Sequence, residues 1–377
     1  MKKVASLCCI VSVFIAGLAT GLNSKSEPLP RLASEVVAAD SFPIEREFLA
    51  ASSKVNELGI MVNEEHRRPP LQPRVLAPSA TRTLVVALGT GHPAPNPNRF
   101  GPATAIIVDE TAYFVDAGEG IWRAAAKAAS IHGGRVAEAL DLTSKPTKVF
   151  LTHLHSDHTV GLPSLMLSPW SYGKKVPLEV YGPPGTKDMV SNLLEAYRLD
   201  IENRVGRSSN DLGWRTVAHD FDIESIVANN QGLVYMDDLV RIEAFQTKHA
   251  NWARSYAYRI TAPDRVIAIG GDGGACEGLS RAVQGADVWF QEIMTETNLA
   301  NAPWGGDSLE EKKKTIWGSH MKPSSLAETA SDAKVKLLVL YHEQNYSNPY
   351  DPDALIKELR ELGFKGNVVS SRDADVF

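Results

Sequence analysis

Short apolar runs, each closed by a polar or glycine-rich turn, recur along the chain from about residue 83 onwards. Such runs predict buried β-strands, whereas apolar residues spaced three and four apart predict helices. Strands are predicted at 84–88, 105–108, 112–115, 148–152, 178–181, 239–245, 255–261, 265–269, 286–293, 336–341 and 367–371. Helices are predicted at 121–131, 162–167, 186–197, 324–334 and 354–362. Strands with interspersed helices predict an α/β fold.

The first 82 residues lack this regular pattern. Lys2 and Lys3 precede an apolar stretch at 4–18 that ends in small residues, which is the build of a secretory signal peptide. We therefore predict a signal at 1–19 and a secreted or periplasmic protein, with an uncleaved membrane anchor as the alternative. Residues 20–82 form a predicted N-terminal extension with one helix at 43–63, and residues 83–377 form the domain proper. No later segment is apolar enough to cross a bilayer.

Net charge and cysteine content argue against a nucleic-acid-binding protein and against one stabilised by disulfides. The net charge of the 377 residues is −6, and loss of the two signal lysines makes it −8. Proteins that grip nucleic acid usually present a basic face, so this charge argues against a nucleic-acid partner. Cys8 and Cys9 lie in the predicted signal, which leaves Cys276 and excludes an intrachain disulfide. The folded chain then depends on its core and on bound metal.

The metal prediction rests on a His-x-His-x-Asp-His motif formed by His153, His155, Asp157 and His158. The motif directly follows the predicted strand at 148–152. Residues two apart on an extended chain point the same way, so the first two histidines can share one ion. The last two residues can turn towards a second ion. Imidazole and carboxylate groups suit zinc, so two divalent ions, with zinc the best match, are predicted.

Four ligands cannot complete two sites. His249, Asp272 and His342 each follow or end a predicted strand, and the loops at one edge of an open sheet gather together. From spacing alone, a capping or surface role remains equally open for each of them. His92 is a candidate substrate contact, and Cys276 is either a late metal contact or a packed residue. Surface positions are predicted for His66, His132 and His219.

Several motifs appear in the order found in one known family. They are Leu-Gly-Thr-Gly at 88–91, Val-Asp-Ala-Gly at 115–118, Thr-His-Leu-His-Ser-Asp-His at 152–158, Gly-Pro-Pro-Gly at 182–185, Tyr-Ala-Tyr-Arg-Ile at 256–260, Gly-Asp at 271–272 and Leu-Val-Leu-Tyr-His at 338–342. Over residues 83–377 the chain resembles the metallo-β-lactamase superfamily, and within it the ribonuclease Z-like and arylsulfatase-like branch. The resemblance implies an αββα sandwich.

The resemblance also implies the ligand sets. One metal would be held by His153, His155 and His249. The other would be held by Asp157, His158 and His342, with Asp272 bridging the two. Asp116 would orient the loop that carries the ligands.

A proton-donating pair is implied as well. His320 and Glu292 occupy the places of a histidine and a glutamate that form this pair in the ribonuclease Z branch. The chain has both residues, but the residues that flank them differ from those of the ribonuclease Z branch. It reads His-Met-Lys at 320–322 and Gln-Glu-Ile-Met at 291–294. Asp157, His320 and Glu292 are therefore the candidate catalytic residues. The altered neighbours argue against tRNA-end processing.

These features predict an exported dinuclear zinc hydrolase that cleaves small phosphodiesters or sulfate esters with a metal-bound hydroxide. A lactonase or β-lactamase using the same metals is the first alternative. A metal-dependent biosynthetic protein with little hydrolysis is the second. The expected partner is a small ester, without nucleic acid and without a stable membrane span after signal cleavage. A homodimer is compatible with these predictions.

Overall fold

The computed structural model describes residues 72–78, 80–205, 212–222, 231–249, 252, 254–344 and 351–377. The predicted signal at 1–19, the predicted helix at 43–63 and most of the predicted extension lie outside these ranges. Within them, no helix combines the length and the apolar character needed to span a membrane.

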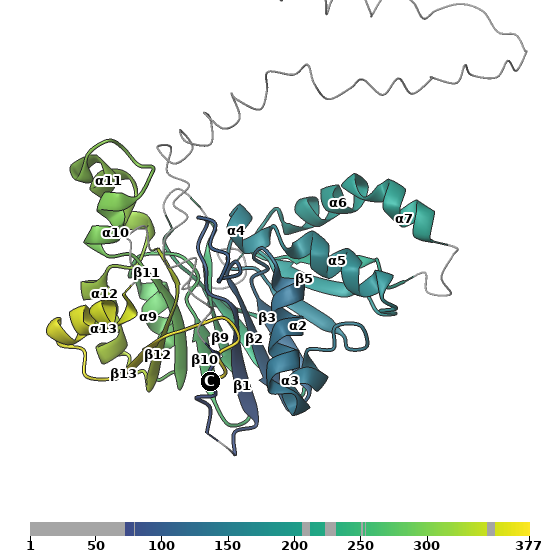
Figure 1. Ribbon diagram of the computed structural model, residues 1–377, viewed down its shortest axis with the longest axis horizontal. Helices are drawn as coiled ribbons and strands as arrows, with labels where there is room; N and C mark the ends of the chain where they lie inside the picture. Colours follow the sequence, from purple (N-terminus) through teal and green to yellow (C-terminus); the bar gives the residue numbers. More distant parts are fainter. Residues whose placement is uncertain are drawn as a thin grey trace, which may run out of the picture. The chain divides into compact units, whose positions relative to one another are not determined.

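Two β-sheets form the centre of the described fold (Figure 1). In the first sheet the strands lie in chain order, and pairing changes from antiparallel for β1–β3 to parallel for β3–β6. Its strands are β1 (Thr83–Gly89), β2 (Ala103–Val108), β3 (Thr111–Val115), β4 (Thr147–Phe150), β5 (Leu178–Gly182) and β6 (Thr216–Asp220).

The second sheet runs in the order β13 to β7, antiparallel for β7–β10 and parallel for β10–β13. Its strands are β7 (Gln231–Met236), β8 (Arg241–Gln246), β9 (Tyr256–Thr261), β10 (Val266–Ile269), β11 (Val288–Ile293), β12 (Leu337–Glu343) and β13 (Asn367–Ser370). Each sheet therefore contains a parallel half whose strands all end at one edge.

Helices cover the outer face of each sheet. On the first sheet lie α2 (Ile121–His132), α3 (Gly134–Ala139), α5 (Leu162–Ser171) and α6 (Thr186–Ala196); on the second lie α9 (Glu277–Val283), α12 (Pro323–Asp332) and α13 (Pro352–Glu361). One apolar cluster fills the space between the sheets, and one lies under each helical layer. The predicted αββα sandwich is confirmed.

Most predicted strands and helices are present, with ends shifted by one to four residues. The strand predicted at 239–245 begins later, at Arg241, because Asp237–Val240 form a turn closed by the Asp237 side chain. The elements that were not predicted include β6, β7, α3, α4 (Ser156–Thr159), α7 (Arg198–Arg204), α9, α10 (Glu296–Asn301) and α11 (Leu309–Thr315). The reason is clearest for α11, which buries no residue and therefore has no apolar period to detect.

Candidate metal centre

The seven predicted ligand residues lie together at the edge where the parallel strands end. β4 stops at Phe150, and the chain continues through His153 and His155 into the one-turn helix α4 (Ser156–Thr159), for which His155 is the N-cap. His249, Asp272 and His342 come from β8, β10 and β12 of the other sheet. The cluster thus joins the two sheets.

One group consists of three histidine rings. His153 Nε2 lies 2.9 Å from His155 Nδ1, and His249 Nε2 lies 3.1 Å from the same atom. The opposite nitrogens of two of these rings are held from behind. Thr152 Oγ1 lies 3.0 Å from His153 Nδ1, and His249 Nδ1 donates to the Ser319 carbonyl over 2.6 Å. Three ring nitrogens therefore face a common point, as a metal site requires.

The second group combines two histidines with a carboxylate. The Asp157 Oδ2 atom lies 3.5 Å from His158 Nε2 and 3.4 Å from His342 Nε2. His342 Nδ1 donates to the Gly91 carbonyl over 2.6 Å, which leaves the Nε2 lone pair directed at the group. Both histidine side chains are fully buried.

Asp272 lies between the two groups. Its Oδ1 atom is 3.3 Å from His158 Nε2, and its Oδ2 atom is 3.2 Å from His342 Nε2. The same carboxylate also lies within 4.8 Å of ligand atoms of His153 and His158. One carboxylate thus reaches donors of both groups, which is the position expected of a bridging ligand.

The donor set fits divalent metal ions. Among the described residues, His158 Nε2 and Asp272 Oδ1 are buried without any hydrogen-bond partner. A buried polar atom without a partner costs about 1–3 kcal/mol, so such atoms are rare unless an ion or water serves them. Imidazole nitrogens and carboxylate oxygens are ligands that zinc accepts. The cluster therefore has both the chemistry and the unsatisfied atoms of a metal centre.

Asp116 supports the cluster from behind. It accepts hydrogen bonds from the Thr152 backbone N–H over 2.8 Å and from the Thr152 hydroxyl, and its Oδ2 lies 2.8 Å from His158 Nδ1. Asp116 has φ 61° and His342 has φ 47°, conformations that L-residues rarely adopt. Strained backbone of this kind persists where the surrounding structure holds it, commonly at functional sites.

Close packing of glycines fixes the same loop. A Cβ atom on Gly118 would lie 2.3 Å from the Gly101 carbonyl carbon and 2.8 Å from the Asp157 carbonyl oxygen. Contacts this short do not occur, so only glycine allows the strand-end loop after β3 to approach α4. This approach holds Asp157 in its position within the second group.

Charge divides the histidines into two kinds. Burial lowers the pKa of His153 well below its usual value, and it lowers the pKa of His155 to about 4, with neighbouring histidines adding to the effect. Burial opposes the protonated form of His158 too, but Asp272 and Asp116 outweigh it and raise the pKa. The three-histidine group is therefore neutral and ready to bind a cation, while the second group is rich in carboxylate.

His320 and Glu292 lie together beside the three-histidine group. His320 Nδ1 is 3.4 Å from Glu292 Oε1, and the His320 and His249 rings are 5.5 Å apart. Burial opposes the charged form of each, yet the carboxylate prevails at His320 and raises its pKa. Glu292 also accepts the Gly273 and Met321 N–H groups, which joins this pair to the Asp272 loop. The arrangement suits a proton donor next to the metal cluster.

Other predicted residues have smaller roles. His92 lines a cavity that includes Asp157, as a substrate contact would. Cys276 packs against the apolar cluster under α9 and α12. His132 contacts the Ala374 carbonyl, and His219 stacks on Tyr181 with ring centroids 4.4 Å apart. His66 lies outside the described residues.

Sequence analysis missed several side chains and carbonyls that touch the ligands. The Trp252 ring lies 5.0 Å from that of His155, and the Gln344 amide nitrogen lies 3.2 Å from His342 Nε2. The carbonyls of Gly91 and Ser319 orient two ligand rings. Thr152 and Gly91 lie in motifs noted above, although their contacts with the ligands were not predicted, and no sequence signal marks Trp252, Gln344 or Ser319, because their contacts are tertiary.

Comparisons with known proteins agree with this geometry. A sequence model of the family described as "Beta-lactamase superfamily domain" matches residues 111–342. Ribonuclease Z of Mycolicibacterium paratuberculosis is 30% identical over 266 residues, which cover 68% of this chain and 85% of the relative.

Two solved structures share the fold. Human tRNase Z, short form, superimposes with a TM-score of 0.54 at 23% identity, over 78% of this chain and 98% of that chain. The Zn(2+)-bound PqqB of Methylobacterium extorquens gives a TM-score of 0.52 at 17% identity, over 78% of this chain and 99% of that chain.

Proposed function

Because this chain belongs to the metallo-β-lactamase superfamily as a ribonuclease Z-like hydrolase, we propose that it cleaves small phosphodiesters with two zinc ions. The observation that carries the proposal is the pair of ligand groups joined by Asp272, with His320 and Glu292 beside them. Zinc-bound PqqB, a fold neighbour, supports the choice of metal.

We assign the ligands as the resemblance implies. His153, His155 and His249 would hold one ion, and Asp157, His158 and His342 the other, with Asp272 shared. When bound, two divalent ions would lower the pKa of a water to about 7 and stabilise charge on the substrate oxygen. Asp157 would contribute a carboxylate oxygen to the second ion, beside His158 and His342.

His320 and Glu292 would then supply the proton that the leaving group needs. His320, kept protonated by Glu292, is placed to give a proton to the leaving oxygen. Glu292 is fixed by two backbone N–H groups and would hold the imidazole in one orientation. This pair favours ester cleavage over lactam or lactone opening, where no separate acid is needed.

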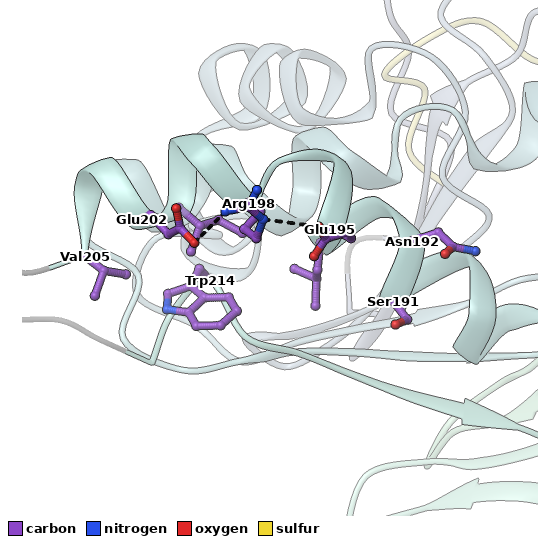
Figure 2. Close-up of a pocket in the computed structure, with 9 residues that line it drawn as sticks. Ser191, Asn192, Glu195, Arg198, Glu202, Val205 and Trp214 are labelled. Atoms are coloured by element: carbon purple, nitrogen blue, oxygen red, sulfur yellow. Dashed lines mark hydrogen bonds and ion pairs between the residues drawn. The ribbon is translucent and has the colours of Figure 1, made fainter. Parts of the chain in front are cut away.

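A small substrate, and not tRNA, agrees with the charge on the α6–α7 arm. Arg198 pairs with Glu195 and Glu202 (Figure 2). Arg204 pairs with Asp200. These arginines are already neutralised by acids of the same arm, whereas binding to an RNA backbone needs basic residues directed at phosphate. The net charge of −6 likewise disfavours binding to an RNA backbone.

The test is a substrate panel with the zinc-loaded protein. Bis(4-nitrophenyl) phosphate should be cleaved faster than 4-nitrophenyl sulfate, a chromogenic lactone and a β-lactam. A precursor tRNA should be cut poorly. Preference for the sulfate, lactone or lactam would replace phosphodiester cleavage with that activity, and no turnover of any of them would favour a biosynthetic role.

We also propose that the chain is exported and trimmed near Ala19, because of the basic start and the short apolar run. The mature protein would then consist of the extension at 20–82 and the hydrolase domain at 83–377. Mass spectrometry of the exported protein decides this. A terminus at Met1 on membrane-held protein would indicate an anchor instead.

A further inference from the structure

A cavity of about 850 Å³ opens next to the second ligand group. Asp157 forms part of its wall, together with the loop 92–101 after β1, the start of α2 and the start of α5. This volume lies within the range of about 300–1,000 Å³ common for small-molecule sites. The cavity is therefore large enough for a substituent attached to a phosphorus atom held at the metals.

Two arginines line the cavity, and Glu343 offsets the charge of one of them. Arg99 is held in place by Glu343, with Nη1 3.4 Å from Oε2, and its side chain is 16% exposed. Arg123 lies in the first turn of α2 and is exposed along the same cavity. Glu119 is the opposing acid, and Asp157 is turned towards His158 and His342. Beyond the ligand residues, the lining thus holds two cations and one anion.

The remaining wall is mixed, with polar side chains of His92, Asn96, Ser156 and Ser164 beside apolar ones. Pro93, Pro95, Phe100 and Val160 line it, and Lys127 covers the Phe100 ring, with Nζ 5.7 Å from the ring centroid. Apolar side chains and arginine in one lining suit a ligand with a carbon spacer and an anionic end. Arginine binds phosphate and carboxylate groups with paired hydrogen bonds.

The cavity and the proton donor lie beside different ligand groups. His320 is next to His249 of the three-histidine group, whereas the cavity includes Asp157 of the second group. A leaving oxygen served by His320 would lie beside the three-histidine group, and His320 is not part of the cavity lining. The ester group that stays on phosphorus has the cavity available to it.

We propose that this cavity is a recognition site for a second anionic group on the retained part of the substrate, bound by Arg99 and Arg123. The inference rests on the proposed phosphodiesterase function and narrows its substrate class. The preferred substrate is a phosphodiester whose retained arm ends in a phosphate or carboxylate. Glu119 opposes this binding and limits its strength.

Binding can be measured without turnover. Isothermal titration of the zinc-loaded protein with propane-1,3-diyl bisphosphate and with propyl phosphate should show at least about tenfold tighter binding of the bisphosphate, because its second phosphate gains a charge-assisted contact. Arg123→Gln should remove most of that difference. Glu119→Gln should increase it. Lys187→Gln, which removes an exposed cation of α6 outside this lining, should leave it unchanged.

The outcomes separate the two proposals. Equal binding of the two probes by the unaltered protein, or equal effects of Arg123→Gln and Lys187→Gln, would overturn the recognition site while leaving phosphodiester cleavage intact. A bisphosphate preference that depends on Arg123, in a protein that cleaves no phosphodiester, would support the site and refute the proposed function. The opposite signs expected for Arg123→Gln and Glu119→Gln exclude a general effect of misfolding.

Discussion

At the scale of single residues, the second ligand group depends on which nitrogen of each histidine faces inward. Asp116 contacts His158 Nδ1, and the Gly91 carbonyl accepts from His342 Nδ1, so both Nε2 atoms are directed at the cluster. A histidine ligand needs such a partner on its far side to fix the tautomer and the ring orientation. Residues that never touch a metal therefore determine whether it can bind.

Replacement of Asp116 tests this dependence. In Asp116→Asn one oxygen must serve the Thr152 N–H, the Thr152 hydroxyl and His158, so His158 loses its orientation. Zinc affinity, measured against a chromophoric chelator, should fall by roughly 10–100-fold, the usual effect of such partners. Asp220→Asn is the control, because Asp220 also accepts backbone N–H groups but at the start of α6. Equal effects of the two variants would contradict the assignment.

His320 separates proton delivery from metal binding. His320→Ala should keep zinc content near normal and slow alkyl phosphodiesters by roughly 10²–10⁴-fold, the range for a positioned acid. A nitrophenyl diester should lose much less, because its leaving group needs no proton. Steady-state kinetics with both substrates measure the difference. Equal slowing would make His320 a substrate clamp, and loss of zinc would show that it belongs to the ligand set.

At the scale of secondary structure, prediction succeeds where burial leaves a pattern. β4, β10 and β12 contain short apolar runs, and the ligands His153, Asp272 and His342 come soon after these runs, so both strands and ligands could be predicted. β6 is half-buried along most of its length and α11 buries nothing, so neither has a detectable period. The contact between Ser319 and His249 depends on how two loops distant in the sequence pack together, so it cannot be predicted from the spacing of residues along the chain.

Lys174 follows α5 and is buried, and burial of its charged form lowers the stability of the folded protein. The residue is 1% exposed, its Nζ donates to Thr147 Oγ1 of β4 over 2.6 Å, and burial lowers its pKa to about 8. In the unfolded chain the pKa returns to about 10.4, so between these values the unfolded state binds the extra proton. Stability from this residue is thus lost as pH falls towards 8 and is fully present above about 10.4.

The corresponding prediction compares the protein with Lys174→Met, which keeps the length of the side chain but cannot titrate. The free energy of unfolding of the unaltered protein, relative to Lys174→Met, should rise between pH 8 and 10 by up to about 3 kcal/mol. Urea melts at a series of pH values provide the measurement. A flat difference across this range would show that Lys174 titrates normally in the folded protein.

At the scale of the whole molecule, the predicted ligand residues come from both halves of the sandwich, so bound metal would link them. Four of its ligands follow β4 of the first sheet, and three come from the second sheet. Without metal, the junction leaves buried polar atoms of His158 and Asp272 without partners. Binding energy at such a site is also folding energy, because the unfolded chain has no preformed site.

Zinc should therefore stabilise the entire domain and bind at two ions per chain. Free zinc at 1,000 times its Kd adds about 4 kcal/mol for each ion, which corresponds to a rise in Tm on the order of 10 °C for a domain of this size. Calorimetry before and after chelation, with elemental analysis of the same samples, measures both quantities. Asp272→Ala removes the shared ligand and should lower the zinc content and most of the rise in Tm, whereas His320→Ala should preserve them. The two ligand groups meet at Asp272, so both should bind zinc together. A content of one ion per chain at saturating zinc would therefore refute the dinuclear assignment. A Tm that chelation does not change would refute it as well.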